Sequence, residues 1–182
     1  MANKETEANR AGSLVDYELY IMRHGIAVTR SVSTVMDDAK RPLTPDGKQR
    51  MREIASGLRR AGLEADWIVS SPLVRAVETA EIVGEALDSK PPFDFCEALS
   101  PGGDPQEFIT FLAKHPNRRR VLAVGHEPDL GELAARLIGA GRNANVGFKK
   151  GGCCLITFNE FPPKSPGRLV WWLSPRIMRK LA

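Results

Sequence analysis

Short apolar runs alternate with helical patterns along most of this chain, from Tyr17 to its C-terminal end. The apolar runs have the length of strands, and the segments between them repeat their apolar residues with the period of a helix. This alternation predicts the element order βαβαβαβαββ. It is typical of a three-layer α/β/α sandwich, in which helices cover both faces of a mostly parallel central sheet, with one or two late strands at an edge.

Local signals predict where the elements begin and end. Strands are expected at 18–23, 67–69, 93–96, 121–124, 153–158 and 169–173, and helices at 45–60, 72–87, 105–114 and 128–138. Thr44 and Ser71 each precede a proline, which is the pattern of an N-cap followed by the first helical turn. Asp104 is expected to cap the third helix.

The remaining composition excludes several classes of protein. The polar residues 1–16 lack periodicity, so we expect a flexible arm followed by one domain at 17–182. The formal net charge of +4 suits an anionic substrate and gives little support for nucleic-acid binding. No apolar run approaches the roughly 18 residues of a membrane span, and the N-terminus lacks the apolar core of a signal peptide. A cytoplasmic protein without a membrane partner is therefore expected.

The cysteines Cys96, Cys153 and Cys154 show neither a paired framework nor the spacing of a zinc site. We expect them to be buried and reduced, with Cys153 and Cys154 on opposite faces of a strand. The histidines also lack the helical spacing of zinc motifs. No metal ion or other cofactor is expected.

Three predicted strands end in residues that carry chemistry. The first strand ends at Arg23 and His24, and the fourth is followed by His126. The second ends before Ser71, and Arg75 lies one turn into the next helix. Ligands of open α/β sheets bind outside the carboxyl ends of the strands, so we expect these residues to share one edge of the sheet.

Phosphoryl transfer would give these residue types a common purpose. Arginine presents a rigid fork of donors that matches phosphate oxygens. A neutral imidazole is a nucleophile that can form a covalent bond to a phosphoryl group, and neighbouring arginines disfavour its protonation. A second histidine can donate to the phosphoryl oxygens as negative charge shifts. Gly25, next to the first histidine, would let the backbone turn sharply.

Each of these residues alone has a plainer interpretation. His24 could be a structural histidine at a strand end, and His126 could serve the start of the following helix. Arg75 could pair with Glu78 or Glu81 on its own helix. Their joint placement at one sheet edge favours the functional interpretation.

Seven segments of the chain match those of a known family. They are LYIMRHGIA (19–27), RPLTPDGKQR (41–50), IVSSPLVRAVETA (68–80), EALSPGGD (97–104), VLAVGHEPDLG (121–131), FKKGG (148–152) and WWLSP (171–175). In their order and spacing they resemble the histidine phosphatase superfamily, also called phosphoglycerate-mutase-like, and within it the SixA-type phosphohistidine phosphatases. The resemblance extends over 18–178. It implies the phosphoglycerate-mutase-like fold and a phosphatase that needs no metal ion.

The resemblance also implies roles for individual residues. His24 would be the nucleophile that becomes phosphorylated, and Arg23 and Arg75 would hold the phosphoryl group. His126 would be the second histidine of the site. Arg41, in RPLT, resembles a further phosphate-binding arginine of this branch, although a solvent-exposed loop arginine is the plainer interpretation.

The general acid is the open part of the assignment. Many members of the superfamily protonate an alcohol leaving group with a Glu or Asp, for which Glu97 and Asp104 are the candidates here. Asp104 also suits a helix cap, and SixA-type proteins resemble one another in having no clear acid. Protonated phosphohistidine needs the acid less, because it expels a neutral imidazole, whose conjugate acid has a pKa of about 6.5. An alkoxide is a far worse leaving group.

We therefore expect a metal-independent phosphatase that acts through phosphorylated His24 on phosphohistidine of a protein, such as a histidine phosphorelay domain. The alternative with the same chemistry is a phosphatase of small phosphate monoesters, which an acid at Glu97 or Asp104 would support. A non-catalytic phosphate-binding protein is the alternative from another class, and the presence of all four principal site residues argues against it. Proteins of this branch resemble compact monomers, so a monomer is expected.

Overall fold

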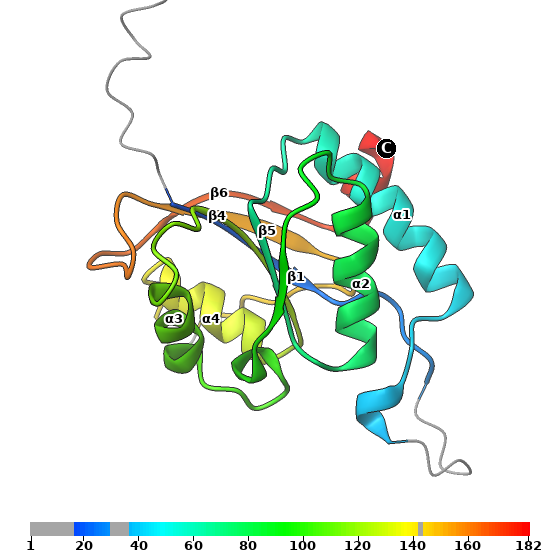
Figure 1. Ribbon diagram of the computed structural model, residues 1–182, viewed down its shortest axis with the longest axis horizontal. Coiled ribbons are helices and arrows are strands. Elements are labelled where there is room, and N and C mark those ends of the chain that lie inside the picture. Colours follow the sequence, from blue (N-terminus) through cyan, green and yellow to red (C-terminus); the bar gives the residue numbers. More distant parts are fainter. Residues whose placement is uncertain (1–16, 30–36, 142–143) are drawn as a thin grey trace, which may run out of the picture.

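The computed structural model describes residues 17–29, 37–141 and 144–182. At its centre is a six-stranded sheet with the strand order β3-β2-β4-β1-β5-β6 (Figure 1). The strands are β1 (Tyr17–Arg23), β2 (Trp67–Ser70), β3 (Phe93–Phe95), β4 (Arg120–Gly125), β5 (Cys153–Phe158) and β6 (Arg168–Leu173). The helices are α1 (Pro45–Arg60), α2 (Val74–Glu85), α3 (Pro105–Ala113), α4 (Asp129–Leu137) and α5 (Pro175–Leu181). The arm predicted at 1–16 lies outside the described residues.

The sheet is mostly parallel, as predicted. β1 pairs in parallel with β4, and β2 pairs in parallel with both β4 and β3. β5 runs antiparallel to β1 and to β6. Arg23 at the end of β1 lies opposite Gly125 of β4, and Ser70 at the end of β2 lies opposite Val124. The carboxyl ends of these three strands therefore meet at one edge.

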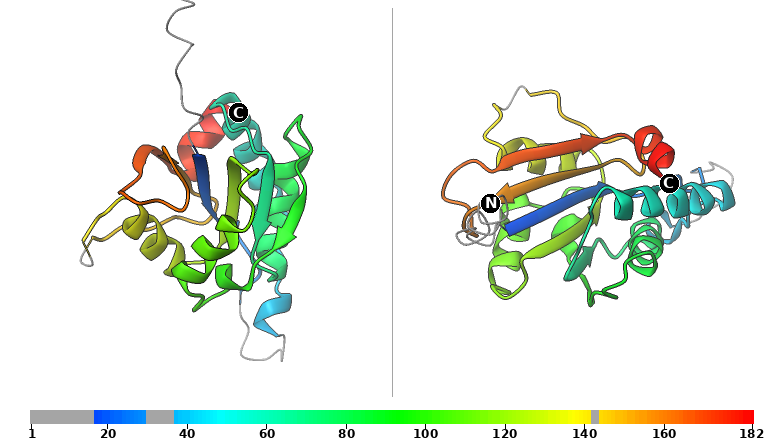
Figure 2. Two further views of the ribbon diagram at one scale, coloured as in Figure 1. Left: turned by 60° about the vertical axis from the view of Figure 1, so that its left-hand side comes forward. Right: turned by 90° about the horizontal axis from the view of Figure 1, so that it is seen from above.

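Helices cover both faces of the sheet, which confirms the predicted α/β/α sandwich (Figure 2). α3 and α4 pack against one face, where their side chains join a core that includes Leu19 and Ile21 of β1. α1, α2 and α5 pack against the other face, where the core includes Tyr20 and Met22 of the same strand. Because side chains alternate along a strand, β1 contributes to both cores.

The cysteines follow the same alternation. Cys153 and Cys154 are fully buried and belong to opposite cores. Cys96 is buried as well, and all three cysteines are free. The prediction of buried, unpaired thiols on opposite faces is confirmed.

The start of α2 differs from its prediction. The helix begins at Val74, and its N-cap position, Leu73, makes no side-chain cap bond. The Ser71 hydroxyl instead lies 2.9 Å from Nε2 of His126, and it accepts the backbone N–H of Leu73 at 3.3 Å. Ser71 thus still accepts the N–H two residues on, as a capping side chain does, but the helix itself begins at Val74.

α5 and two one-turn 3-10 helices, at Asp38–Lys40 and Glu97–Leu99, are absent from the predicted elements. α5 has only seven residues, too few for a clear helical period. Its packing on α1 explains why it forms. Met178 is fully buried, and a Cβ at Gly57 of α1 would lie only 1.9 Å from the carbonyl oxygen of Met178.

Candidate active site

The carboxyl ends of β1, β2 and β4 are joined by backbone hydrogen bonds just beyond the strands. His24 donates its N–H to the carbonyl oxygen of Gly125 at 3.1 Å, and Ser71 donates to that of Val124 at 2.9 Å. His126 follows Gly125 directly. The three segments that the sequence assigns to one edge of the sheet are therefore in contact, as predicted.

His24 is buried, with 7% of its surface exposed. Its Nδ1 lies 2.7 Å from the carbonyl oxygen of Gly25. A carbonyl oxygen can only accept, so Nδ1 carries the proton and Nε2 keeps a lone pair. Burial, above all, lowers the pKa of His24 to about 4, and the charges of Arg75 and Arg23 lower it further, while the bond to Gly25 opposes this shift. The ring is therefore neutral at pH 7, and burial contributes more to this than the arginines that the sequence suggested.

Gly25 is required by close packing. A Cβ at this position would lie 2.7 Å from Cγ of Met51 in α1 and 3.3 Å from Leu43. Its N–H donates to Oγ1 of Thr79 at 3.0 Å, and the Thr79 hydroxyl donates to the carbonyl oxygen of Arg75 at 2.6 Å. Thr79 thus connects the backbone beside His24 to the helix that carries Arg75. The expected reason for this glycine, a sharp turn, is replaced by a steric one.

The turn at 148–152 holds the same backbone from the other side. The N–H of Gly151 points at the carbonyl oxygens of Arg23 and His24, at 3.1 and 3.0 Å. Gly151 has φ of +79°, in the region that favours glycine. Nη1 of Arg23 donates to the carbonyl oxygen of Phe148 at 2.7 Å. The FKKGG segment therefore positions the first histidine and its neighbouring arginine.

His126 lies beside His24, with ring centroids 5.0 Å apart and planes inclined by 53°. It is 3% exposed, and its Nε2 lies 2.9 Å from Oγ of Ser71. Burial is the main cause that lowers the pKa of His126 to about 3, with contributions from His24 and Arg75. Both site histidines are thus neutral at pH 7.

Arg75 is 4% exposed, and all three of its guanidinium nitrogens have partners within the chain. Nε donates to Nε2 of His24 at 3.3 Å. Nη1 donates to the carbonyl oxygen of Asp38 at 2.8 Å, and Nη2 to the Asp38 carboxylate at 3.0 Å. The alternative pairing with Glu78 does not occur, because that carboxylate binds Lys48 and the N–H of Leu43.

Arg41 joins this cluster through the same carboxylate. Its Nε and Nη2 lie 2.9 and 2.8 Å from Oδ1 of Asp38, and its Nη1 donates to the carbonyl oxygen of Val28 at 2.7 Å. Asp38 therefore bridges Arg41 and Arg75. Arg41 is half-buried and belongs to the cluster, rather than to an exposed loop.

Two buried nitrogens at the site have no hydrogen-bond partner among the described residues. They are Nε of Arg23 and Nδ1 of His126. A buried polar group without a partner costs about 1–3 kcal/mol, and such groups require an explanation. Nε of Arg23 is a donor, and Nδ1 of His126 is one as well if it carries the proton, so both are of the type that an oxyanion accepts from.

The acid candidates lie outside this cluster. The Asp104 carboxylate accepts the N–H of Gln106 at 2.7 Å and caps α3, as predicted. The Glu97 carboxylate accepts from the Ser100 hydroxyl at 3.2 Å. The Ser100 Oγ in turn lies 3.5 Å from Oγ of Ser71. In the part of the chain that the structure describes, neither carboxylate forms a hydrogen bond or ion pair with the two histidines, Arg23 or Arg75.

No group of three or more His, Cys, Asp or Glu side chains within the described ranges is placed to hold a metal ion. None of the helices described is both long and apolar enough to cross a membrane.

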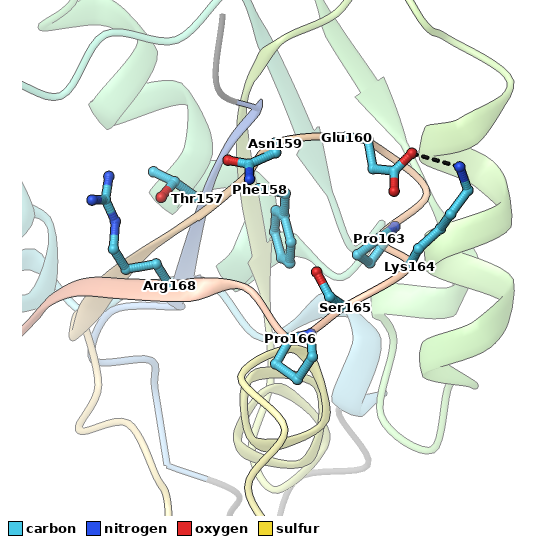
Figure 3. Close-up of a pocket in the computed structure, with 9 residues that line it drawn as sticks. All are labelled: Thr157, Phe158, Asn159, Glu160, Pro163, Lys164, Ser165, Pro166 and Arg168. Carbon is cyan, nitrogen blue, oxygen red and sulfur yellow. Dashed lines mark hydrogen bonds and ion pairs between the residues drawn. The ribbon is translucent and has the colours of Figure 1, made fainter. Parts of the chain in front are cut away.

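A separate hollow lies at the hairpin between β5 and β6 (Figure 3). Its lining includes Phe158, Arg168 and the ion pair of Glu160 with Lys164 at 2.7 Å. Phe158 pairs with Tyr17 at the start of β1, whereas Cys153 pairs with Met22 near its end. The hollow therefore lies at the end of the sheet away from His24, and it contains none of the predicted site residues.

A comparison with protein families finds a match at residues 19–100 to the model described as the histidine phosphatase superfamily (branch 1). The match includes Arg23, His24, Arg41 and Arg75, and it ends before His126.

Two proteins resemble the chain over most of its length. The phosphohistidine phosphatase SixA of Escherichia coli (strain K12) is 30% identical over 160 residues, which cover 87% of this chain and 94% of that protein. An uncharacterised protein of Picosynechococcus sp. is 38% identical over 138 residues, which cover 74% of this chain and 81% of that protein.

Solved structures also match the fold of this chain. The structure of the protein histidine phosphatase SixA complexed with tungstate matches with a TM-score of 0.74 and 28% identity, over 87% of this chain and 97% of that one. The fold also matches a mycobacterial glucosyl-3-phosphoglycerate phosphatase, with a TM-score of 0.65 and 18% identity, over 87% of this chain and 99% of that one.

Proposed function

This chain belongs to the histidine phosphatase superfamily as a phosphatase, and on that premise we propose that it hydrolyses phosphohistidine on a protein through a covalent intermediate on His24. The observation that carries the proposal is the state of the His24 ring. Its Nδ1 proton is held by the carbonyl oxygen of Gly25, and its Nε2 lone pair accepts the Nε–H of the buried Arg75 at 3.3 Å. This long hydrogen bond would be released when Nε2 attacks phosphorus. A neutral imidazole with a fixed tautomer beside a cation is suited to attack a phosphoryl group.

In the first step, the Nε2 lone pair of His24 forms a bond to phosphorus while the bond between phosphorus and the substrate imidazole breaks. The bonding pair leaves with the substrate nitrogen. Protonation of the other substrate nitrogen makes the leaving group a neutral imidazole. In the second step, a water oxygen attacks phosphorus, the bond to Nε2 breaks, and the water protons pass to phosphate or solvent. Since Nδ1 of His24 keeps its proton throughout, His24 also leaves as a neutral imidazole.

The surrounding donors would hold the phosphoryl oxygens in both steps. We assign this role to Arg23, Arg75 and Arg41, whose guanidinium groups match oxyanion geometry. His126 would add a donor if Nδ1 carries its proton. The Ser71 hydroxyl supports this tautomer, because it can donate to Nε2 of His126 while it accepts the N–H of Leu73. Such donors act in a buried site, where they stabilise the transition state strongly.

The leaving group is inferred from the carboxylates. A monoester substrate needs a proton donor for its alkoxide. Asp104 caps α3, and Glu97 reaches His126 only through two hydroxyls that are 3.5 Å apart, which is long for a hydrogen bond between oxygens. Asp38 is ionised, as its pKa is lowered by two arginines against the effect of burial. Glu127 follows His126, and burial raises its pKa, but its carboxylate accepts the N–H of Phe148 at 2.8 Å. The placements of these carboxylates support a leaving group that needs no proton from the enzyme, which is the case for phosphohistidine.

A protein substrate is supported by the charges beside the site. A hollow next to Gly25 is lined by Arg50, Lys150, Arg176 and Arg179, and no carboxylate among the described residues lines it. All four cations are exposed. Arg50 forms an ion pair with Asp46 and Arg179 with Glu53, so the positive charge offered to a partner rests chiefly on Lys150 and Arg176. An acidic surface around the phosphohistidine of a partner, such as a phosphorelay domain, would be attracted to them.

The test is a paired turnover assay in EDTA, with a phosphohistidine-bearing protein and a panel of phosphate monoesters as substrates. We expect the phosphoprotein to be hydrolysed with the higher kcat/KM. Phosphate trapped on His24 should be labile to acid and stable to base, and it should be absent in His24→Ala. Faster turnover of monoesters would refute phosphohistidine as the preferred substrate and would favour Glu97 as a general acid. Full activity of His24→Ala would refute the mechanism.

A further inference from the structure

The Asp38 carboxylate occupies the arginines that the proposed function assigns to the phosphoryl group. One oxygen lies 3.0 Å from Nη2 of Arg75, and the other lies 2.9 and 2.8 Å from Nε and Nη2 of Arg41. This is how a tetrahedral oxyanion would use the same two side chains, with different oxygens on different guanidinium groups.

Arg75 has no nitrogen to spare in this arrangement. Its Nε is directed at His24, and both terminal nitrogens are directed at Asp38, one to the carboxylate and one to the backbone carbonyl. A phosphoryl group that binds Arg75 must therefore replace at least one of these partners. Attack by Nε2 of His24 on phosphorus releases the bond from Nε of Arg75. The carboxylate is the partner that repels an incoming phosphoryl group, because two anions would then share one buried guanidinium.

The geometry of the segment permits such an exchange. Asp38 starts a one-turn 3-10 helix, Asp38–Lys40, which contains no buried residue. The carboxylate itself is about one-third exposed, whereas Arg75 is 4% exposed. The cation is thus enclosed by its surroundings, whereas the anion sits on a short surface element without a buried residue.

We propose that Asp38 is an internal competitor that binds Arg75 and Arg41 until a phosphoryl group displaces it, and that binds them again when phosphate leaves. The inference rests on the proposed function of the two arginines. Asp38 would then determine specificity. Only an oxyanion that binds Arg75 and Arg41 more strongly than the Asp38 carboxylate does could occupy the site. It also predicts that inorganic phosphate, the product, is bound weakly.

The opposite role for Asp38 makes the opposite prediction. If the carboxylate served to orient Arg75 and Arg41 for the substrate, its removal would weaken oxyanion binding. The sign of the change in affinity therefore decides between the two roles.

The experiment is titration calorimetry of the full chain with inorganic phosphate and with tungstate. In Asp38→Asn the amide oxygen can still accept from one of the two arginines, and the backbone bond from Arg75 remains. The substitution removes the negative charge and one of the two acceptor oxygens. We expect Asp38→Asn to bind both anions roughly tenfold more tightly, on the scale of a hydrogen bond to a charged group. Equal or weaker binding overturns the proposal.

The control is Asp37→Asn. The Asp37 carboxylate is one residue away and caps the same turn through the N–H of Ala39, a role that Asn can fill. This variant loses the same charge without a contact to either arginine, and its affinity should match that of the wild type. An equal gain in both variants would show a general charge effect and refute the competitor.

Binding and turnover separate this inference from the proposed function. When Asp38→Asn is combined with Arg75→Ala, the anion affinity should be no higher than that of Arg75→Ala alone. A higher affinity would show that the anion binds elsewhere, and it would refute the inference. If the gain depends on Arg75 but phosphohistidine is not a substrate, the proposed function fails and the competitor stands. If phosphohistidine is hydrolysed through His24 while Asp38→Asn shows no gain, only the competitor fails.

Discussion

Gly25 and Thr79 are 54 residues apart in the sequence and are joined by a hydrogen bond of 3.0 Å from the backbone N–H of Gly25 to the Thr79 hydroxyl. The same hydroxyl donates to the carbonyl oxygen of Arg75. One buried side chain thus sets the position of the backbone beside His24 relative to the helix that carries Arg75. Both the stability and the activity of the protein should depend on it.

Thr79→Val tests this connection with a side chain of nearly the same shape. The buried N–H of Gly25 loses its acceptor, so we expect a loss of about 1–3 kcal/mol in the free energy of unfolding. Urea denaturation measures this loss, and kcat should fall more than KM rises. Thr79→Ser keeps the hydroxyl and should retain most of both properties. Equal effects of the two variants would show that packing, rather than the hydroxyl, matters here.

Arg75→Ala should slow turnover by about 10²–10³, on the scale of removing one preorganised donor from a transition state. Arg75→Lys keeps the charge but loses the fork of donors, so it should restore only part of the rate. Steady-state kinetics with a phosphohistidine-bearing protein measures both, and circular dichroism checks that the variants fold. A change of only a few-fold in Arg75→Ala would contradict the assigned role.

The two site histidines should make stability depend on pH. The pKa of His24 is lowered to about 4 and that of His126 to about 3, chiefly by burial. As the pH falls below about 6.5, the histidines of the unfolded chain become protonated before those of the folded protein. The free energy of unfolding is therefore highest above that pH, and it decreases as the pH falls toward 4. Urea denaturation across this range should show a decrease on the order of a few kcal/mol, and His24→Asn should show a smaller one.

Nitrogen-15 NMR of the imidazole rings provides a direct check of the same states. His24 should remain neutral down to about pH 4, with the proton on Nδ1, as its bond to Gly25 requires. Titration near the ordinary value of about 6.5 would rule out the buried, neutral nucleophile.

Ser71→Ala tests the tautomer of His126. Without the hydroxyl, Nε2 of His126 loses the group that favours a proton on Nδ1, so phosphate binding and kcat/KM should fall by up to about tenfold. The ring nitrogen shifts of His126 should change, while those of His24 should not. An unchanged His126 spectrum would show that Ser71 does not set this proton.

The sequence predicts the residues at the strand ends better than the contacts between them. His24 and His126 follow from the apolar runs that precede them, because parallel strands place their carboxyl ends at one edge. Ser71, by contrast, resembles a helix cap, since its local pattern with Pro72 is the same as that of Thr44 with Pro45, which does begin a helix. Nothing in the local pattern shows that folding places a histidine within its reach.

Asp38 and Thr79 were also beyond local patterns. Asp38 lies in a loop without periodicity, and its contact with Arg75 spans 37 residues. Thr79 sits inside a helix, where a threonine has no distinctive signature, and its partner on Gly25 lies on another element. A helical pattern offers Arg75 two nearby carboxylates, Glu78 and Glu81, and only the folded structure shows that a third one binds it.

The backbone bonds that join the ends of β1, β2 and β4 have a consequence for how such an enzyme can diverge. The groups that would make and break the phosphorus bond stand where hydrogen-bonded strands end, whereas Asp38, Arg41 and the cations beside Gly25 stand on surface segments. Substitutions in those segments can alter which molecules are accepted and how readily the product departs, without disturbing the reacting atoms. The same chemistry can thus be inherited intact while its targets change.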